Sequence, residues 1–388
     1  MKKIVLLVLF ALCIGRSWAQ MHAYSTNFTF SETNFVDTIP IELVNGQILF
    51  NAEVGGVICK FCFDTGSSQG TIFVQNGAIP YKELGNVLSR DGVGHQDTTK
   101  VAMLPNFRLG HLEVSGYVAS VFKQQVRQNY DAIIGFDIIN KGLCCKIDTR
   151  RNIMILTDRR DVFDREIGYS IGYKLRWWVP YILVSPFKRH WDEVLFDTGS
   201  RQLFTMNKQS FDKHAYKSKQ VNAQVEQRVK GHVSIGSMGA ERPDEVAFLK
   251  MERLRWDNFV FTNVRAITTQ GASRIGTDIL KYGTITIDSY RRKITFIPHD
   301  GRDSTEVNNK TYSIAYVPYQ GKPTVGLILP GCDEYKAGLR QGDMLLEVDG
   351  QPLKSFLDFQ HFPFVIGRTY KLLVRTKEGK NKMVMITR

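Results

Sequence analysis

The tetrapeptide Asp-Thr-Gly-Ser occurs twice in this chain, each time directly after an apolar run that predicts a β-strand. The first copy spans residues 64–67 and the second spans residues 197–200. One copy alone is typical of an ordinary turn at the end of a strand. Two copies at equivalent points indicate two strand ends that meet in a shared site and bring Asp64 and Asp197 together.

The segments around the two copies repeat in the same order, at a period of about 135 residues. Each half has strands before its Asp, then a glycine-containing loop, a strand pair, an apolar segment that ends in Gly, and a hairpin. The loops contain Gly92 and Gly94 in the first half and Gly236 and Gly239 in the second. The apolar segments are Ile-Ile-Gly at 133–135 and, less completely, Arg-Ile-Gly at 274–276. This order predicts two similar lobes, over residues 36–160 and 165–298, with a helix or ordered insertion at 207–229.

The composition is that of a globular protein with more than one domain. The chain has 388 residues, of which 43% are hydrophobic and 23% are charged, and these values exclude a disordered chain. The formal net charge is +13, but the basic residues are scattered and no nucleic-acid-binding motif accompanies them. We therefore expect a solvated basic surface and no nucleic-acid partner.

The first 19 residues have the features of a signal peptide. Lys2 and Lys3 precede an apolar stretch from Ile4 to Ile14, and Ser17-Trp18-Ala19 matches a cleavage site. The apolar stretch is too short to span a membrane, and no later run of about twenty apolar residues follows. The sequence predicts an exported protein, periplasmic or secreted, with no transmembrane segment.

Five cysteines follow the predicted cleavage site. Cys59 and Cys62 have the spacing of half a zinc site, but Cys144 and Cys145 are adjacent and do not complete it. We therefore predict no metal. Disulfides between these clusters and buried free thiols are both compatible with the sequence.

A third unit is predicted over residues 311–388. The polar, turn-rich stretch between Pro298 and Lys310 indicates a linker before it, and we expect the unit to fold alone. Ser355 is expected to cap a helix that runs toward His361, with Asp358 completing the capping box. Two closing strands are expected at 369–376 and 382–386.

The two lobes resemble the aspartic peptidases of the pepsin and retropepsin type, through both Asp-Thr-Gly-Ser motifs and the apolar segments that end in Gly135 and Gly276. The third unit resembles a PDZ domain, through Ala-Gly-Leu at 337–339, Gly342-Asp343 and Val-Asp-Gly at 348–350. The resemblance implies a mainly β fold, with two retropepsin-like acid-protease β-barrel lobes and a C-terminal PDZ-like α+β domain. One departure is that the first loop has no Tyr where pepsin-like enzymes carry one.

The resemblance implies an aspartic endopeptidase in which Asp64 and Asp197 are catalytic and a peptide or protein is the substrate. Two carboxyl groups that share one proton activate a water and polarise a carbonyl in the same step, without metal or cofactor. Thr65 and Thr198 are expected to brace the loops, and the hydroxyls of Ser67 and Ser200 to bond the ionised carboxylates and favour acid-range activity. The supporting residues are Thr65, Gly66, Ser67, Thr198, Gly199 and Ser200, and the candidate flaps contain Gly92, Gly94, Gly236 and Gly239.

A groove for a peptide ligand is expected between a strand near 325–329 and the helix at 355–361 of the PDZ-like domain. The alternative for this unit is a purely structural role, as a cap on the rest of the protein that binds no peptide. For the whole chain, the alternative to a peptidase is a non-catalytic scaffold that binds peptides. Close approach of the two catalytic carboxylates would favour the peptidase, and a wide separation would favour the scaffold.

Overall fold

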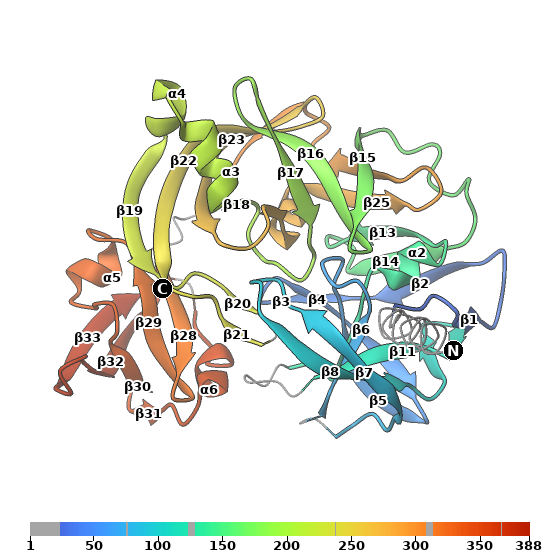
Figure 1. Cartoon of the computed structure of the whole chain (residues 1–388), viewed down its shortest axis with the longest axis horizontal. Helices are drawn as coiled ribbons and strands as arrows, with labels where there is room; N and C mark the ends of the chain where they lie inside the picture. The colour runs from blue at the N-terminus through green and yellow to red at the C-terminus, as the bar shows by residue number, and fades with distance from the viewer. Residues whose placement is uncertain (1–23, 75–76, 123–128, 237, 308–312, 366) are drawn as a thin grey trace, which may run out of the picture.

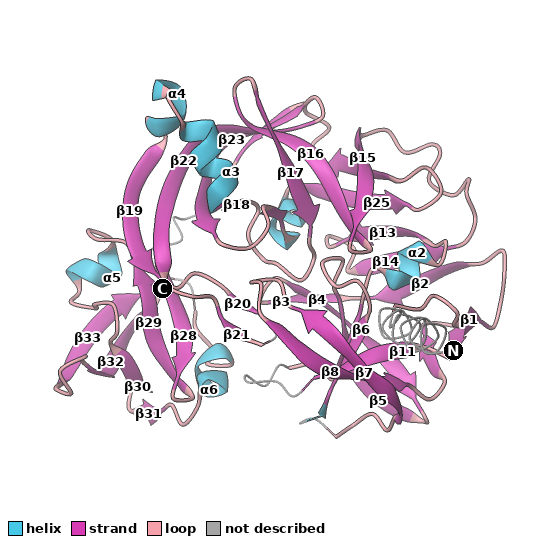
Figure 2. Ribbon diagram, in the orientation of Figure 1, coloured by secondary structure: helices cyan, strands magenta, loops and turns pink. Residues whose placement is uncertain are grey.

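The structure, a computed structural model, describes residues 24–74, 77–122, 129–236, 238–307, 313–365 and 367–388. The chain is mainly β, as predicted, and short helices lie between the strands (Figure 2). The predicted signal peptide, residues 1–19, lies outside the described residues. Among the helices that are described, none is both long and apolar enough to cross a membrane.

A shared run of strands, in the order β15-β26-β25-β13-β14-β2, joins the two lobes (Figure 1). The first lobe supplies β2 (Val36–Pro40), β13 (Cys144–Asp148) and β14 (Ile153–Thr157). The second supplies β15 (Tyr169–Arg176), β25 (Gly283–Asp288) and β26 (Lys293–Pro298). At the centre β13 and β25 are antiparallel, with Lys146 opposite Thr286. Each lobe thus contributes one strand from its start and a hairpin from its end, which relates the lobes by an approximate twofold axis.

The rest of the first lobe is an 11-stranded sheet that folds around an aromatic-rich core. Its strands are β1 (Thr29–Phe30), β3 (Glu42–Val44), β4 (Gln47–Val54), β5 (Val57–Phe63), β6 (Gly70–Phe73), β7 (Lys82–Arg90), β8 (Gln96–Met103), β9 (Phe107–Leu109), β10 (Leu112–Ser115), β11 (Val118–Phe122) and β12 (Ala132–Ile134), and α2 spans Asp137–Asn140. The lobe begins earlier than the predicted residue 36, because β1 pairs with β10 and Phe28 is buried in the core.

The second lobe repeats this plan within a 14-stranded sheet that includes the shared strands. Its further elements are β16 (Val179–Phe187), β17 (His190–Phe196), β18 (Thr205–Asn207), β19 (Val225–Gly231), β20 (Ile235–Gly236), β21 (Gly239–Ala240), β22 (Asp244–Trp256), β23 (Phe259–Thr269), β24 (Arg274–Ile275), the 3-10 helix η2 (Thr277–Lys281), α3 (Lys208–Ala215) and α4 (Lys219–Asn222). The helices α3 and α4 occupy the predicted insertion, where the Asn207 side chain caps α3 by accepting from the Ser210 N–H.

The segment after Pro298 is part of the second lobe and not a free linker as predicted. Residues Ser304–Glu306 form β27, which pairs in parallel with β23. Val307 is 1% exposed and belongs to the main core. Polar residues dominate this segment, so the sequence indicated a linker and gave no sign that Val307 is buried.

The C-terminal unit is a small sheet with two short helices. Its elements are β28 (Ile314–Tyr319), β29 (Lys322–Ile328), α5 (Asp333–Lys336), β30 (Met344–Val348), β31 (Gln351–Pro352), α6 (Phe356–Gln360), β32 (Thr369–Arg375) and β33 (Asn381–Thr387). The predicted capping box is confirmed: Ser355 accepts from the Asp358 N–H, and the Asp358 carboxylate accepts from the Ser355 N–H.

The strand predicted to line the peptide groove, β29, is not at the edge of the sheet. β29 lies inside the sheet, paired with β28 along its length and with β30 at Thr324. The sheet ends in β28 on one side and in β33 on the other. The Tyr316 ring of β28 packs against Phe359 of α6 at 4.6 Å between centroids. Because free backbone groups lie at the edges of a sheet, a peptide strand added beside α6 would pair with β28.

The C-terminal unit has a hydrophobic core of its own and also shares a smaller one with the second lobe, which weighs against the prediction that it folds alone. Ala315, Leu327 and Leu329 pack with a group of apolar side chains from the lobe, and the His232 N–H donates to the Gly326 carbonyl at 3.0 Å. The partners in the lobe are Val233, Val246, Phe248 and Ile267. Separation of the unit would expose both sides of this core to water.

We expect Leu327→Ala to lower the free energy of unfolding by about 2–5 kcal/mol, because it leaves a cavity in the shared core. Chemical denaturation should show one transition for the unit and the second lobe together. Met385→Ala, at an exposed position of β33, is the matched control and should change stability little. Two separate transitions in the parent protein would contradict the shared core.

The five cysteines within the described residues form no disulfides. Cys59, Cys62, Cys144, Cys145 and Cys332 are all free thiols, and the first four are buried. Of the two possibilities that the sequence left open, the structure has buried free thiols.

Candidate active site

The two Asp-Thr-Gly-Ser loops are built in the same way. Asp64 follows β5, which is parallel to β12, and its N–H donates to the Ile134 carbonyl at 3.0 Å. Asp197 follows β17, which is parallel to β24, and its N–H donates to the Ile275 carbonyl at 2.9 Å. The apolar segments identified in the sequence therefore hold the start of each loop.

Gly135 and Gly276, which end these segments, lie directly against the loops. A Cβ atom at Gly135 would be 2.7 Å from the Ser67 carbonyl oxygen, and one at Gly276 would be 2.3 Å from that of Ser200. Only glycine permits this close approach.

Thr65 and Thr198 brace the loops across the interface between the lobes. The Thr65 N–H donates to the Thr198 hydroxyl at 2.9 Å, and the Thr198 N–H donates to the Thr65 hydroxyl at the same distance. Each hydroxyl then donates to a carbonyl of the opposite lobe, that of Phe196 at 2.7 Å for Thr65 and that of Phe63 at 2.8 Å for Thr198. Both threonines are buried, so this reciprocal network fixes the two loops relative to each other.

Gly66 and Gly199 let each loop approach the carboxyl group of the other. The Gly66 N–H donates to Asp64 Oδ1 at 2.8 Å, and the Gly199 N–H donates to Asp197 Oδ1 at 2.9 Å. A Cβ at Gly66 would lie 2.4 Å from Asp197 Oδ1, and one at Gly199 would lie 2.5 Å from Asp64 Oδ1. Alanine at either position would displace a carboxyl group of the opposite lobe.

The carboxyl groups of Asp64 and Asp197 lie in one site and interact with each other. Burial raises the pKa of Asp64 from 3.8 to about 7, and the charge of Asp197 and a hydrogen bond between the two carboxyl groups add to the rise. Asp197 is 8% exposed, and its Oδ2 forms an ion pair with Arg274 Nε at 3.3 Å. The contacts favour the protonated form of Asp64.

The serines of the motifs do not have the role expected from the sequence. The Ser67 hydroxyl donates to the Gln69 carbonyl at 2.7 Å and not to Asp64. In the described part of the chain no hydrogen bond joins the Ser200 hydroxyl to Asp197. The raised pKa of Asp64 also contradicts the low value that we expected, because burial outweighs the hydrogen bonds from the Gly66 and Ser67 N–H groups.

Arg274 is the site residue that sequence analysis missed. It lies opposite Leu195, two residues before Asp197, just as Ile133 lies opposite Cys62, two residues before Asp64. The signal was present in the sequence, since the second apolar segment begins with Arg where the first has Ile.

Both candidate flaps lie at hairpins, and their tips meet. Gly92 and Gly94 are in the turn between β7 and β8, and the Gly92 carbonyl accepts a hydrogen bond from Arg274 Nη2. Gly236 and Gly239 pair across the β20–β21 hairpin, which Figure 1 shows extending toward β7 and β8. The Met238 N–H of that hairpin donates to Asp91 Oδ2 at 3.1 Å. The first hairpin therefore reaches the second lobe beside Asp197.

Another buried acid, Asp137, follows the first apolar segment. Its side chain is inaccessible to solvent, and the Gly70 N–H approaches Oδ2 at 3.4 Å. Burial raises the pKa of Asp137 from 3.8 to about 7. Because the folded-state pKa is the higher one, the contribution of Asp137 to stability is complete below about pH 4 and is lost as the pH rises through 7.

Asp137→Asn should therefore make stability less dependent on pH. We expect the free energy of unfolding of the variant, relative to that of the parent protein, to rise by up to about 4 kcal/mol between pH 4 and pH 8. Each unit of pKa shift corresponds to about 1.4 kcal/mol. Urea denaturation at pH 4, 6 and 8 measures this difference. Asp333→Asn, at an exposed acid, is the control, and equal pH dependence of both variants would contradict the assignment.

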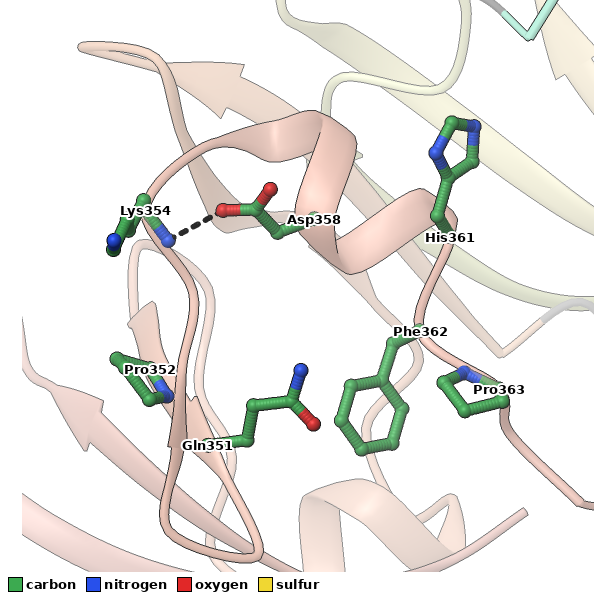
Figure 3. A pocket seen from close by; sticks show the side chains of 7 residues that line it. All are labelled: Gln351, Pro352, Lys354, Asp358, His361, Phe362 and Pro363. Atoms are coloured by element: carbon green, nitrogen blue, oxygen red, sulfur yellow. Dashed lines mark hydrogen bonds between the residues drawn. The ribbon is translucent and has the colours of Figure 1, made fainter.

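A separate pocket lies in the C-terminal unit beside α6 (Figure 3). Its one aspartate, Asp358, accepts from the Lys354 N–H at 2.7 Å and belongs to the capping box. The lining residues are Gln351, Pro352, Lys354, Asp358, His361, Phe362 and Pro363. The pocket therefore contains no residue of the Asp64–Asp197 site.

Comparison with known proteins assigns no family. No family model matches the chain, and no curated protein matches it either. Among solved structures the chain is similar to basic 7S globulin from soybean, with 9% sequence identity and a TM-score of 0.43. The match covers 68% of this chain and 94% of the globulin.

Proposed function

We propose that this protein is an exported aspartic endopeptidase that hydrolyses peptide bonds with a water activated by Asp64 and Asp197. The observation that carries the proposal is the contact between these two carboxyl groups, one from each lobe, within the Thr65–Thr198 network. Two carboxyl groups in contact hold one proton between them, which is the state that this reaction requires.

The two acids have different surroundings, and this suggests their roles. Asp197 is paired with Arg274 and is the base that takes a proton from water as the water attacks the peptide carbonyl carbon. Asp64, with its raised pKa, is the acid that donates its proton to the carbonyl oxygen. As the resulting diol collapses, Asp64 takes back a hydroxyl proton, Asp197 gives its proton to the amide nitrogen, and the C–N bond breaks. The hairpin that contains Gly92 would close over the bound peptide.

The non-catalytic peptide-binding scaffold is the competing function. Contact between the carboxyl groups supports the peptidase, because a binding protein has no need to hold two acids together at the cost of a raised pKa. The C-terminal unit would then serve as an accessory module, in which the edge strand β28 recruits an extended peptide.

A peptide library incubated with the protein from pH 3 to pH 8, and read by mass spectrometry, tests the proposal. We expect internal peptide bonds to be cleaved, with activity falling above about pH 7 as Asp64 ionises. Peptides that carry a hydroxyl-bearing carbon in place of the scissile carbonyl should inhibit, because they resemble the tetrahedral intermediate. Peptide binding without cleavage at any pH would instead support the scaffold.

A further inference from the structure

Arg274 breaks the symmetry of the two lobes at the point where the chemistry is expected. Its counterpart Ile133 packs in an apolar cluster with Leu49, Cys62 and Phe73. Arg274 is 9% exposed, and its guanidinium group points into the site. A buried guanidinium needs partners, because an unpaired buried charge is costly.

The guanidinium group joins the site to the first flap. Nε lies 3.3 Å from Asp197 Oδ2, in an ion pair that lacks the alignment of a hydrogen bond. Nη2 donates a hydrogen bond to the Gly92 carbonyl at the tip of the β7–β8 hairpin. One side chain therefore contacts both the carboxylate and the flap.

Two glycines leave room for the guanidinium group. A Cβ at Gly92 or at Gly271 would lie 2.9 Å from Nη2, and a Cβ at Gly271 would also lie 2.6 Å from the Gly92 carbonyl oxygen. The turn at the flap tip is closed by Asp91, whose carboxylate accepts from the N–H groups of Val93 and His95 at 3.1 and 2.8 Å. The carbonyl that Arg274 meets is thus held in place by the turn.

We infer that Arg274 is a positioning residue that latches the tip of the first flap to Asp197 and holds a positive charge beside this carboxylate for its role as base. The inference rests on the proposed peptidase function for the second of these effects only. The latch itself is a contact between two parts of the fold and can be measured whether or not peptides are cleaved.

The charge effect depends on the groups that face Asp197. These are Asp64 and Cys62 from the first lobe, and Tyr181 and Arg274 from the second. Arg274 supplies the positive charge within this set, so its removal disfavours the carboxylate form. When Arg274 is removed, the low-pH limb of the profile of kcat/KM against pH should therefore move to higher pH.

Arg274→Ile and Arg274→Lys in the full chain separate the two effects. In Arg274→Ile we expect the acid limb of kcat/KM to move up by about one pH unit or more, because a cation this close is removed. The flap N–H groups of Gly94 and His95 should exchange with solvent about fivefold faster or more, because the bond to the flap is lost. Arg274→Lys should keep the acid limb but lose the protection, since a single ammonium group cannot reach both partners.

Arg108→Ile, at an exposed ion pair with Glu53, is the control and should change neither measurement. Gly92→Ala is a second variant, whose methyl group presses on Nη2 and should speed flap exchange. Unchanged exchange in Arg274→Ile and Gly92→Ala would overturn the latch. An unchanged acid limb in Arg274→Ile would overturn the charge effect. Absence of cleavage in the parent protein would instead refute the proposed function, and the exchange data would still decide the latch.

Discussion

Asp64→Asn and Asp197→Asn should each lower kcat/KM for peptide cleavage by about 10³-fold or more, because acid–base catalysis by a positioned side chain contributes on this order. Asparagine has nearly the same shape as aspartate, but it can neither accept a proton from water nor donate one to a carbonyl. The carboxyl groups act as one unit, so the double variant should be little worse than either single variant. Cleavage rates of a defined peptide, measured at each variant's own optimum pH, give the comparison.

Stability separates loss of chemistry from loss of structure in these variants. Both should stay folded, and Asp64→Asn should be at least as stable as the parent at pH 8, because it removes a buried group that must ionise there. Asp333→Asn controls for the change of charge and should keep full activity. Near-parental turnover in either Asp64→Asn or Asp197→Asn would show that these two carboxyl groups are not the catalytic pair.

Thr65→Val should lower the free energy of unfolding by about 2–6 kcal/mol, since it leaves two buried groups without partners at about 1–3 kcal/mol each. These groups are the Thr198 N–H and the Phe196 carbonyl. Thr198→Val should have a similar effect, through the Thr65 N–H and the Phe63 carbonyl. Cleavage should also fall, because the network holds the two carboxyl groups at their spacing.

A double-mutant cycle shows whether these threonines act together. The double variant Thr65→Val/Thr198→Val should lower the free energy of unfolding by less than the sum of the single variants, because the two hydroxyls lie in one contact network and loss of either lets that network relax. Thr369→Val, in an exposed hydroxyl pair with Thr387, is the control and should be nearly neutral. If the changes in the free energy of unfolding were strictly additive, the two threonines would not brace the loops as one network.

The repeated local signals predicted much of the fold. The apolar runs before Asp64 and Asp197 form β5 and β17, and the segments that end in Gly135 and Gly276 pack on the two loops. These features could be predicted because each depends on the sequence within a few residues and occurs twice. The cap at Ser355 is local in the same way.

The features that were missed depend on contacts far apart in the sequence. The edge position of β28 follows from sheet order, which strand propensity does not specify. The core around Leu327 forms between segments roughly 80 residues apart, which local patterns do not pair. The polar residues near Val307 gave no sign that this side chain is buried in the main core. The Ser67 hydroxyl bonds a nearby carbonyl and not the acid, a choice that only the loop geometry determines.

Carbon-13 NMR of aspartate carboxyl groups tests most directly the claim that Asp64 and Asp197 hold one proton between them. The Asp137→Asn background removes the other acid whose pKa burial raises to about 7. In that background we predict one aspartate signal that stays in the protonated form up to about pH 7 and disappears when Asp64→Asn is added. Ionisation of every aspartate near the ordinary value of 3.8 would contradict the shared proton, and with it the proposed chemistry.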